Sequence, residues 1–338
     1  MPDSWTSYRD AVRVELDEVI NNGPSSLRNM LRYHMGWVDE RGNPCDRPSG
    51  KFVRPGLCLL SCQAVGGSTA QIMPAAAALE LIHKFSLIHD DIEDVSHERH
   101  HRPTVWKVWG QPQAINAGDA MLTLAYSALY KLKENGVAGE RVAGSTRIVS
   151  LACLELCDGQ SLDLGYEDRL DVTITDYLDM AAKKTAALFA ASTYLGAYLG
   201  NEDAKLQDAF YLFGKELGMA YQICDDIMGI WGREETTGKS ASDIAQRKKT
   251  LPVVYALRSS NGEASQMLER LYSQQSIQDD DIALVTSILG DLGARNYAED
   301  LAEQYYCRAL AQLEASRLGP ASQARLREMA GFLVKRDF

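Results

Sequence analysis

Apolar residues recur along most of the chain with a period close to 3.6, while the strict alternation typical of strands is almost absent. The longest such segment spans residues 74–94 and begins with a proline, which a helix accepts in its first turn. Val12, Leu16 and Ile20 form a shorter stripe that ends at a turn sequence over residues 21–24. The same periodicity predicts further helices, over residues 53–67, 113–134, 140–164, 173–200, 204–231, 250–259, 279–289, 292–317 and 320–334. The chain is therefore predicted to be all-α, with ten or more helices around one core.

Two polar stretches, residues 39–50 and 232–249, are predicted to be loops. The length of 338 residues alone would suggest two domains. No long linker rich in Pro, Gly or Ser divides the sequence, and we find no internal repeat or low-complexity tract. We therefore expect a single domain over residues 1–338.

The charge balance limits the class of partner. Acidic residues number 46 and basic residues 35, which gives a formal net charge of −11. Nucleic acid is an unfavourable partner for such a chain, whereas a phosphate-bearing small molecule is compatible with it because basic residues can cluster locally. The N-terminus lacks the basic start and apolar core of a signal peptide, and the most apolar long segment, residues 186–200, is shorter than the about 20 residues of a membrane span. We expect a cytoplasmic protein without a membrane span.

The seven cysteines are scattered and odd in number, which argues against disulfides. Two pairs, Cys58/Cys62 and Cys153/Cys157, have a spacing of four residues that could suit a metal. Burial as small apolar side chains explains them better.

The predicted helix over residues 74–94 ends in three carboxylates, Asp90, Asp91 and Asp94. On a helix, like charges four residues apart cost about 0.2–0.5 kcal/mol, and the C-terminal end of the dipole disfavours anions. A bound cation would reverse both effects, and oxygen ligands on one helix face suit Mg²⁺ shared with substrate phosphates. The alternative is a solvated acidic helix end.

Asp225 and Asp226 repeat this arrangement, because they again follow an apolar helical segment. A second acidic pair in the same setting makes surface decoration a weaker explanation. Two such faces could hold several cations and a highly charged anion between them.

Several basic residues occur where they could bind that anion. Lys51 and Arg54 lie at the start of a predicted helix, which favours phosphate, although a solvated basic turn is the alternative. Lys184 lies in apolar helical sequence and either extends to the surface or points into a cavity. Further basic residues follow the first acidic cluster or lie on the polar loop: Arg99, His100, His101, Arg102, Lys239 and Lys248. For the two loop lysines, plain solvation is the alternative.

No nucleophile–base motif, phosphate-binding glycine loop or zinc-like histidine spacing is present. Carboxylates suited to metals, basic residues and an apolar interior together suit a diphosphate ester with a hydrocarbon tail.

Six motifs carry a family resemblance: GKFVRP (50–55), ELIHKFSLIHDDIED (80–94), GQSLDL (159–164), KKTA (183–186), YQICDD (221–226) and GKSASDIAQRKKTLP (238–252). In this order and spacing they resemble the trans-polyprenyl diphosphate synthases. The resemblance implies an isoprenoid synthase fold with a central active-site cavity and a homodimer. It also implies Mg²⁺-dependent head-to-tail condensation of an allylic diphosphate with isopentenyl diphosphate.

The resemblance also implies roles for individual residues. Asp90, Asp91 and Asp94 would bind two Mg²⁺ ions on the allylic diphosphate, and Asp225 and Asp226 a third. The remaining roles follow in the same way: Lys184, Lys239 and Arg99 contact that diphosphate; Lys51, Arg54 and His83 bind isopentenyl diphosphate; Thr185 and Gln222 flank the allylic carbocation; and Lys248 helps to close the site.

Chain length in this family depends on bulk below the first acidic motif. Phe85 and the small Ser86 lie five and four residues before Asp90, a pattern similar to that of archaeal-type geranylgeranyl diphosphate synthases. The resemblance implies that Phe85 ends the tail pocket after a geranylgeranyl, or alternatively a farnesyl, product. Phe85 as an ordinary core residue is the alternative.

The sequence departs from the family at two places. His100 stands where the family has the second arginine of Arg-Arg-Gly, which helps to bind isopentenyl diphosphate, so the resemblance implies this substrate-binding role for His100. With a reference pKa near 6.5, it carries less charge than arginine at pH 7. Arg102 could compensate. Gly229 occupies the position of the third aspartate of the second acidic motif, where Asp243 could contribute a carboxylate instead.

These departures leave two alternatives. One is a terpene cyclase of the same fold, which would ionise an allylic diphosphate without isopentenyl diphosphate. The other is a non-catalytic regulatory subunit of a prenyl synthase. The intact Lys51, Arg54 and His83 favour chain elongation over the first, and both acidic clusters argue against the second.

Overall fold

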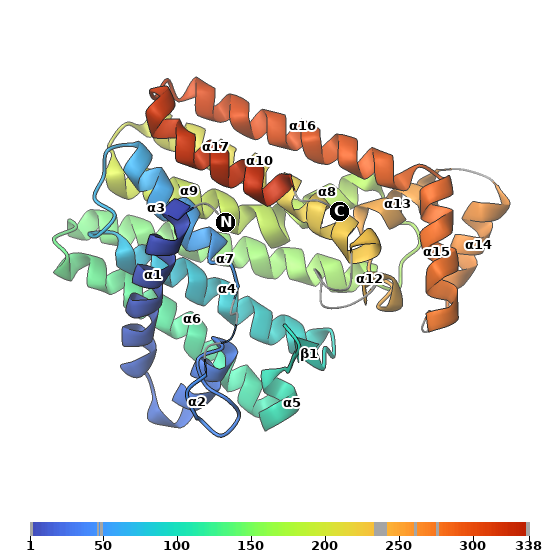
Figure 1. The fold of residues 1–338 in the computed structure, drawn as a ribbon, viewed down its shortest axis with the longest axis horizontal. Coiled ribbons are helices and arrows are strands. Elements are labelled where there is room, and N and C mark those ends of the chain that lie inside the picture. The colour runs from blue at the N-terminus through green and yellow to red at the C-terminus, as the bar shows by residue number, and fades with distance from the viewer. Residues whose placement is uncertain are drawn as a thin grey trace. The chain divides into compact units, whose positions relative to one another are not determined.

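The computed structural model describes residues 3–45, 47, 50–232, 242–259, 262–274 and 277–335 (Figure 1). The α-helices in this part of the chain are α1 (Asp3–Asn21), α2 (Ser25–His34), α3 (Val53–Ala64), α4 (Met73–Glu93), α5 (Val105–Trp109), α6 (Gln111–Glu134), α7 (Gly139–Tyr166), α8 (Ile174–Ala181), α9 (Ala187–Gly200), α10 (Ala204–Trp231), α12 (Ser242–Ala245), α13 (Leu251–Arg258), α14 (Glu263–Tyr272), α15 (Asp279–Asp291), α16 (Ala294–Ala315) and α17 (Pro320–Val334). A π-helix, η1 (Ala182–Ala186), joins α8 to α9, and β1 (Glu98–Arg99) and β2 (Arg102–Pro103) form a short hairpin.

The all-α prediction is confirmed, and the predicted boundaries of most long helices lie within two residues of those observed. The periodicity missed α2, α5 and α14, which are ten residues long or shorter. It also predicted one continuous helix over residues 173–200, which the π-helix interrupts. Within the predicted loop 232–249, the described part contains the short helix α12.

Two compact units divide the chain: one comprises Met1–Ser150 and Ser192–Gln207, the other Leu151–Ala191 and Asp208–Phe338. The expectation of a single domain stays a prediction, because a compact unit in this sense need not fold on its own.

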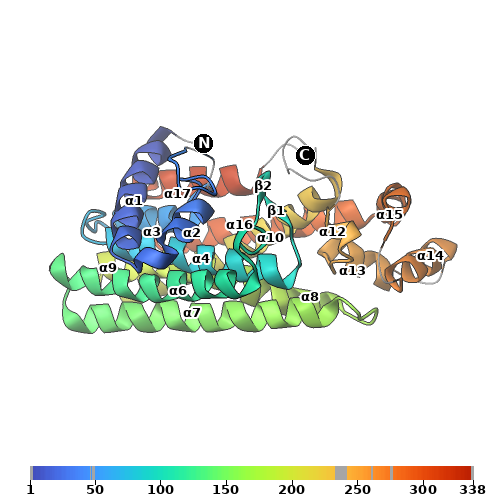
Figure 2. The same cartoon turned by 90° about the horizontal axis from the view of Figure 1, so that it is seen from below.

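In the first unit, α4 packs against α6, α3 and α1, and Figure 2 shows it between α6 and the N-terminal helices. Its N-terminal half carries four consecutive alanines, Ala75 to Ala78, all fully buried. Their small side chains let neighbouring helices approach closely, and burial on every side explains the nearly continuous apolar sequence. The packing of α4 against α6, α3 and α1 therefore positions its acidic end.

In the second unit, a hydrophobic cluster includes Ile244 of α12, Val253 of α13 and Leu268 of α14. Helix α13 also packs against α16, where the rings of Tyr255 and Tyr297 stack with their centroids 4.2 Å apart. This core positions the segment that precedes α13, which carries Lys248.

No disulfide joins cysteines in the part of the chain that the structure describes, and Cys58, Cys62 and Cys153 are buried. Across the same residues, no helix has both the length and the apolar character that crossing a membrane requires.

Candidate active site

The first acidic group lies where α4 ends in the first unit. Asp94 caps the helix, and Val95 follows in the left-handed region at φ 52°. The chain then enters the β1–β2 hairpin, whose two-residue turn places His100 and His101 at φ 52° and 58°. Such turns require positive φ at both central residues, which glycine adopts readily and histidine only at some cost.

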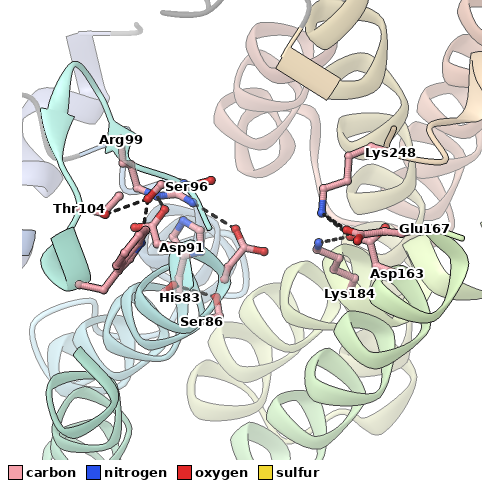
Figure 3. A network of polar contacts seen from close by, with 12 residues as sticks. His83, Ser86, Asp91, Ser96, Arg99, Thr104, Asp163, Glu167, Lys184 and Lys248 are labelled. Atoms are coloured by element: carbon pink, nitrogen blue, oxygen red, sulfur yellow. Dashed lines mark hydrogen bonds and ion pairs between the residues drawn. The ribbon is translucent and has the colours of Figure 1, made fainter. Parts of the chain in front are cut away.

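The hairpin directs Arg99 back onto the end of α4 (Figure 3). Its Nε donates to Oδ1 of Asp91 at 2.9 Å, and its Nη2 donates to Oδ2 of Asp90 at 3.1 Å. Thr104 fixes the base of the hairpin, because its hydroxyl donates to the carbonyl oxygen of Ser96 at 2.8 Å. Burial lowers the pKa of Arg99, but Asp91 and Asp90 outweigh this effect and the pKa is raised. The guanidinium therefore already relieves the repulsion between the two carboxylates.

The residues predicted to bind isopentenyl diphosphate gather beside this group. Arg54 lies buried on the first turn of α3, preceded by Phe52 with left-handed backbone at φ 50°. Burial, then Arg54 and Lys84, hold the pKa of His83 well below its ordinary value. Lys51 lies exposed just before the helix.

The sequence did not single out a buried ion pair on α4, Glu80 and Lys84. The two side chains are 2% and 3% exposed, and Nζ of Lys84 lies 3.5 Å from Oε1 of Glu80. Burial raises the pKa of Glu80, while Lys84 and Arg54 act in the opposite direction. Their spacing of four residues was the only sequence signal for this pair.

In the second unit, Lys184 lies in the π-helix η1, where the wider turn interrupts an otherwise α-helical segment. Gly159 on α7 lets the two segments approach closely: a Cβ at this position would lie 2.6 Å from Cα of Lys184. Nζ of Lys184 donates to Oδ2 of Asp163 at 2.6 Å. Lys248 lies 3.6 Å from the same oxygen and donates to Oε1 of Glu167 at 3.2 Å (Figure 3).

These contacts form one charged cluster of Asp163, Glu167, Lys184 and Lys248. Burial raises the pKa of Asp163, but Lys184 and Lys248 outweigh it and the pKa falls below its ordinary value. Lys184 thus points toward other charged groups instead of extending to the surface. The sequence drew attention to the motif around Asp163 without assigning that residue a role.

A second hydrogen-bonded chain links the residues predicted to flank the carbocation. The hydroxyl of Thr185 donates to Oε1 of Gln222, whose Nε2 donates to Oδ1 of Asp226 at 2.8 Å. Asp226 also accepts at Oδ2 from the hydroxyl of Tyr177 at 2.7 Å and from the backbone N–H of Leu251 at 2.8 Å. Burial raises the pKa of Asp226 to about 7, against the influence of these three donors.

Asp243 lies beside the second acidic pair. A Cβ at position 229 would lie 2.8 Å from Cγ of Asp243 and would overlap one of its oxygens, so Gly229 leaves the space that this carboxylate fills. Burial raises the pKa of Asp243 to about 6, with Lys248 acting in the opposite direction and Asp225 in the same one.

Whether these carboxylates suit Mg²⁺ can be judged from their present partners. No group of three or more His, Cys, Asp or Glu side chains among the described residues has the geometry of a metal site. Asp90 and Asp91 nevertheless converge on one cation, the guanidinium of Arg99. Their oxygens are the hard ligands that Mg²⁺ prefers, so this pair fits the ion if Arg99 gives way. Metal binding by Asp226 would compete with its three hydrogen bonds.

Other predicted residues are placed as follows. Phe85 is buried, with its ring 5.0 Å from that of His89 in an edge-to-face arrangement, and Ser86 donates to the carbonyl oxygen of His83 at 2.8 Å. Arg102 donates to the carbonyl oxygens of Tyr33 and Val38. Arg102 would have to give up these bonds to take the role of the arginine that is absent at position 100. Lys239 lies outside the described residues.

A helical fold with carboxylates and basic residues gathered where helices end or widen is that of the isoprenoid synthases. The family model for polyprenyl synthetase matches residues 37–289. The chain belongs to this family.

Similar proteins agree with this assignment. The chain is 37% identical over 315 residues to a (2E,6E)-farnesyl diphosphate synthase of Mycobacterium tuberculosis, covering 92% of this chain and 86% of that one. It is 37% identical over 309 residues to a geranylgeranyl diphosphate synthase of the same organism, covering 90% and 87%.

Solved structures of related synthases match the fold of this chain. The crystal structure of a polyprenyl synthetase from Streptomyces coelicolor matches with a TM-score of 0.91 and 36% identity, over 98% of each chain. A geranylgeranyl pyrophosphate synthase from Corynebacterium glutamicum, complexed with isoprenyl diphosphate and magnesium, matches with a TM-score of 0.84 and 26% identity, over 98% of each chain.

Proposed function

We propose that the chain condenses an allylic diphosphate with isopentenyl diphosphate in a Mg²⁺-dependent, head-to-tail reaction. The product is a short-chain prenyl diphosphate, geranylgeranyl diphosphate in the first place and farnesyl diphosphate in the second. The observation that carries the proposal is the convergence of Asp90 and Asp91 on a single cation beside a cluster of Arg54, His83 and Lys84. Relatives named as farnesyl and geranylgeranyl diphosphate synthases support it.

Asp90, Asp91 and Asp94 would hold two Mg²⁺ ions, and Asp225 with Asp226 a third. When bound, Mg²⁺ neutralises negative charge that develops on a departing diphosphate. The three-ion count rests on the family resemblance, and the complex of the related Corynebacterium enzyme with magnesium supports the choice of metal.

The chain's own basic residues would hold the allylic diphosphate. Arg99, Lys184 and Lys239 are the proposed contacts, and Lys248 the residue that closes the site. In this structure Arg99 and Lys184 are paired with carboxylates, so substrate would exchange one anionic partner for another. Preorganised positive charge of this kind stabilises the leaving diphosphate as the C–O bond breaks.

The reaction then joins two carbon skeletons. The double bond of isopentenyl diphosphate attacks the allylic cation, one C–C bond forms, and a proton leaves the adduct to the released diphosphate. Thr185 and Gln222 would flank the cation, held in place by the hydrogen bonds to Asp226. The apolar interior excludes water that would otherwise capture the cation. Phe85 is the proposed end of the tail pocket.

We further propose a cytoplasmic homodimer. The homodimer rests on the family resemblance. Ile115 and Tyr130 on α6, which are 47% and 70% exposed, are the positions that we propose for its interface. The proposed localisation rests on the composition, because seven scattered cysteines argue against a disulfide-bonded secreted protein. No observation favours the cyclase or the non-catalytic subunit over a synthase.

One experiment tests the function. Purified protein with Mg²⁺ is incubated with farnesyl diphosphate, with and without isopentenyl diphosphate, and the products are identified by mass spectrometry. Geranylgeranyl diphosphate only in the presence of both substrates is the expected result. A hydrocarbon or terpene alcohol from farnesyl diphosphate alone would establish the cyclase instead. No turnover with farnesyl or shorter allylic diphosphates would overturn the proposal.

A further inference from the structure

The geometry points to Lys84 as a binding residue for the diphosphate of isopentenyl diphosphate, where it supplies the positive charge that His100 does not. This inference rests on the proposed function and names a residue that neither the motifs nor the family resemblance assigned. Three observations carry it: the position of the Lys84 ammonium, the pocket it shares with His100, and its electrostatic surroundings.

The ammonium group lies against the segment predicted to bind this diphosphate. A Cβ added at Gly50 would be 3.4 Å from Nζ of Lys84. Gly50 directly precedes Lys51 and stands four residues before Arg54. Lys84 therefore approaches, from α4, the turn that carries both of these basic residues.

Lys84 and His100 also line one pocket in the first unit, together with His34, Asp91 and Arg99. The cavity itself is small, with a volume of about 30 Å³, and it opens to solvent. The basic side chains of Lys84 and Arg99 on its wall make it attractive to an anion.

His100 cannot supply the missing charge near neutral pH. Partial burial, then Lys84 and Arg99, lower its pKa to about 4. The ring is therefore neutral at pH 7, whereas the family's arginine in this position would be charged. Two other cations on the wall of this pocket could replace the arginine, Arg102 and Lys84. Arg102 already donates to the carbonyl oxygens of Tyr33 and Val38, which favours Lys84.

The surroundings of Lys84 favour an additional anion. The pKa of Lys84 lies below its ordinary value. Burial is the main cause, Arg99 and Arg54 act in the same direction, and Glu80 acts in the opposite one. Placing a buried lysine near two arginines is unfavourable, and a bound diphosphate would reverse that cost through charge-assisted hydrogen bonds. Glu80 holds the ammonium in position at 3.5 Å.

The competing explanation is structural: Lys84 would only neutralise buried Glu80. The two explanations differ in what the Lys84→Met variant does and in what rescues it. A binding role predicts a KM for isopentenyl diphosphate raised about 10- to 100-fold, the loss expected for a hydrogen bond to a charged group. The KM for farnesyl diphosphate and the kcat should stay within about twofold.

Two double variants separate these explanations. Lys84→Met with His100→Arg returns a cation to the same pocket and should recover most of the affinity for isopentenyl diphosphate. Lys84→Met with Glu80→Gln removes both members of the ion pair and should recover thermal stability while the raised KM persists. The inference would be overturned if adding Glu80→Gln to Lys84→Met restored the wild-type KM for isopentenyl diphosphate. It would also be overturned if Lys84→Met folded and its KM for isopentenyl diphosphate were unchanged. The control is Lys205→Met, an exposed lysine on α10 in the same unit, which should leave both KM values unchanged.

Failure of the proposed function would be visible separately. If wild-type protein elongates neither farnesyl diphosphate nor a shorter allylic diphosphate, the proposed function fails whatever Lys84 does. Calorimetric titration of isopentenyl diphosphate onto wild type and Lys84→Met then tests the inference without turnover. Equal affinities would overturn it, and a loss of about tenfold or more would support it.

Discussion

Asp226 illustrates how much a single buried side chain can organise. Its carboxylate accepts hydrogen bonds from Tyr177 on α8, from Gln222 on its own helix and from the first residue of α13, Leu251. Gln222 in turn holds Thr185 on the π-helix. The residue predicted as a metal ligand therefore also fixes the two residues proposed to flank the cation.

Replacing Tyr177 by Phe tests this role. The change removes one of three donors to a carboxylate that is 4% exposed, and we expect unfolding free energy to fall by about 1–3 kcal/mol. Urea denaturation measures the loss. Tyr130→Phe, in which the tyrosine is 70% exposed, should change stability little. Equal stability of Tyr177→Phe and wild type would contradict the organising role of Asp226.

His34 should make stability depend on pH. Burial, then Lys84 and Arg99, hold its pKa well below the ordinary value of 6.5. The folded protein thus keeps His34 neutral while the unfolded chain binds a proton, so this contribution to stability is complete above pH 6.5 and is lost as pH falls below it.

The comparison of wild type with His34→Gln isolates that contribution. Asp226 and Asp243, whose pKa values are raised to about 7 and 6, change stability in the opposite direction and are present in both proteins. The stability of wild type relative to the variant should fall by up to about 1.4 kcal/mol per pH unit below pH 6.5. Urea titrations at several pH values measure it, and a difference independent of pH would refute the assignment.

At the scale of elements, the most informative feature is the π-helix between α8 and α9. Residues 173–200 have the apolar pattern of one continuous helix, yet the turn over residues 182–186 is widened. The close approach of α7 at Gly159 accompanies this widening. Lys184 and Thr185 lie in this turn, so the packing of two segments determines where both side chains point.

The variant Gly159→Ala tests whether that packing matters. The added methyl group would overlap the backbone of Lys184, so we expect a loss of about 1–3 kcal/mol in stability and a lower kcat. Gly165→Ala on the same helix meets no atom within 4 Å and should be neutral or stabilising by up to about 1 kcal/mol. If both variants behave alike in thermal melts and turnover, close packing at Gly159 has no such role.

Helix α4 presents both the first acidic group and the proposed end of the tail pocket. Phe85 precedes Asp90 by five residues, about 7.5 Å along the helix axis. Phe85→Ala should therefore open space beyond the tail and lengthen the products, as measured by chromatography of the dephosphorylated prenols. Phe210→Ala, which truncates a buried phenylalanine on α10, should destabilise the protein without lengthening them. Unchanged products from Phe85→Ala would mean that Phe85 is ordinary core.

At the scale of the whole molecule, the formal charge of −11 coexists with local groups of basic residues. Among the described residues, each compact unit contains carboxylates paired with basic side chains, such as Arg99 in the first unit and Lys184 and Lys248 in the second. Net charge therefore gives no measure of anion binding, because the basic residues that matter are gathered at particular sites.

The proposed homodimer gives a prediction at this scale. Ile115→Glu and Tyr130→Glu place charge on exposed apolar positions of α6 and should shift the mass measured by light scattering from dimer toward monomer. The control is Val14→Glu on α1, because Val14 is 70% exposed, as Tyr130 is. A wild-type protein that is monomeric at micromolar concentration would contradict the proposal.

The helices of the fold could be predicted because periodicity is local, and boundaries such as those of α10 and α17 agree with the structure. The short helices and the π-helix could not, because tertiary packing outweighs weak local preference in such segments. The motif residues were also identifiable, since their types and spacing are visible in the sequence.

What the sequence determined by itself is the class of fold and the chemical groups available: carboxylates at the ends of apolar helices and basic residues near them. Only the tertiary structure decided which groups meet. Arg99 forms ion pairs with Asp90 and Asp91, and Lys184 forms one with Asp163. Lys84 lies beside Gly50 and lines the same pocket as His100. Most of these partners come from different elements of the chain, and electrostatic interactions depend on distance in space and on burial, neither of which sequence spacing fixes.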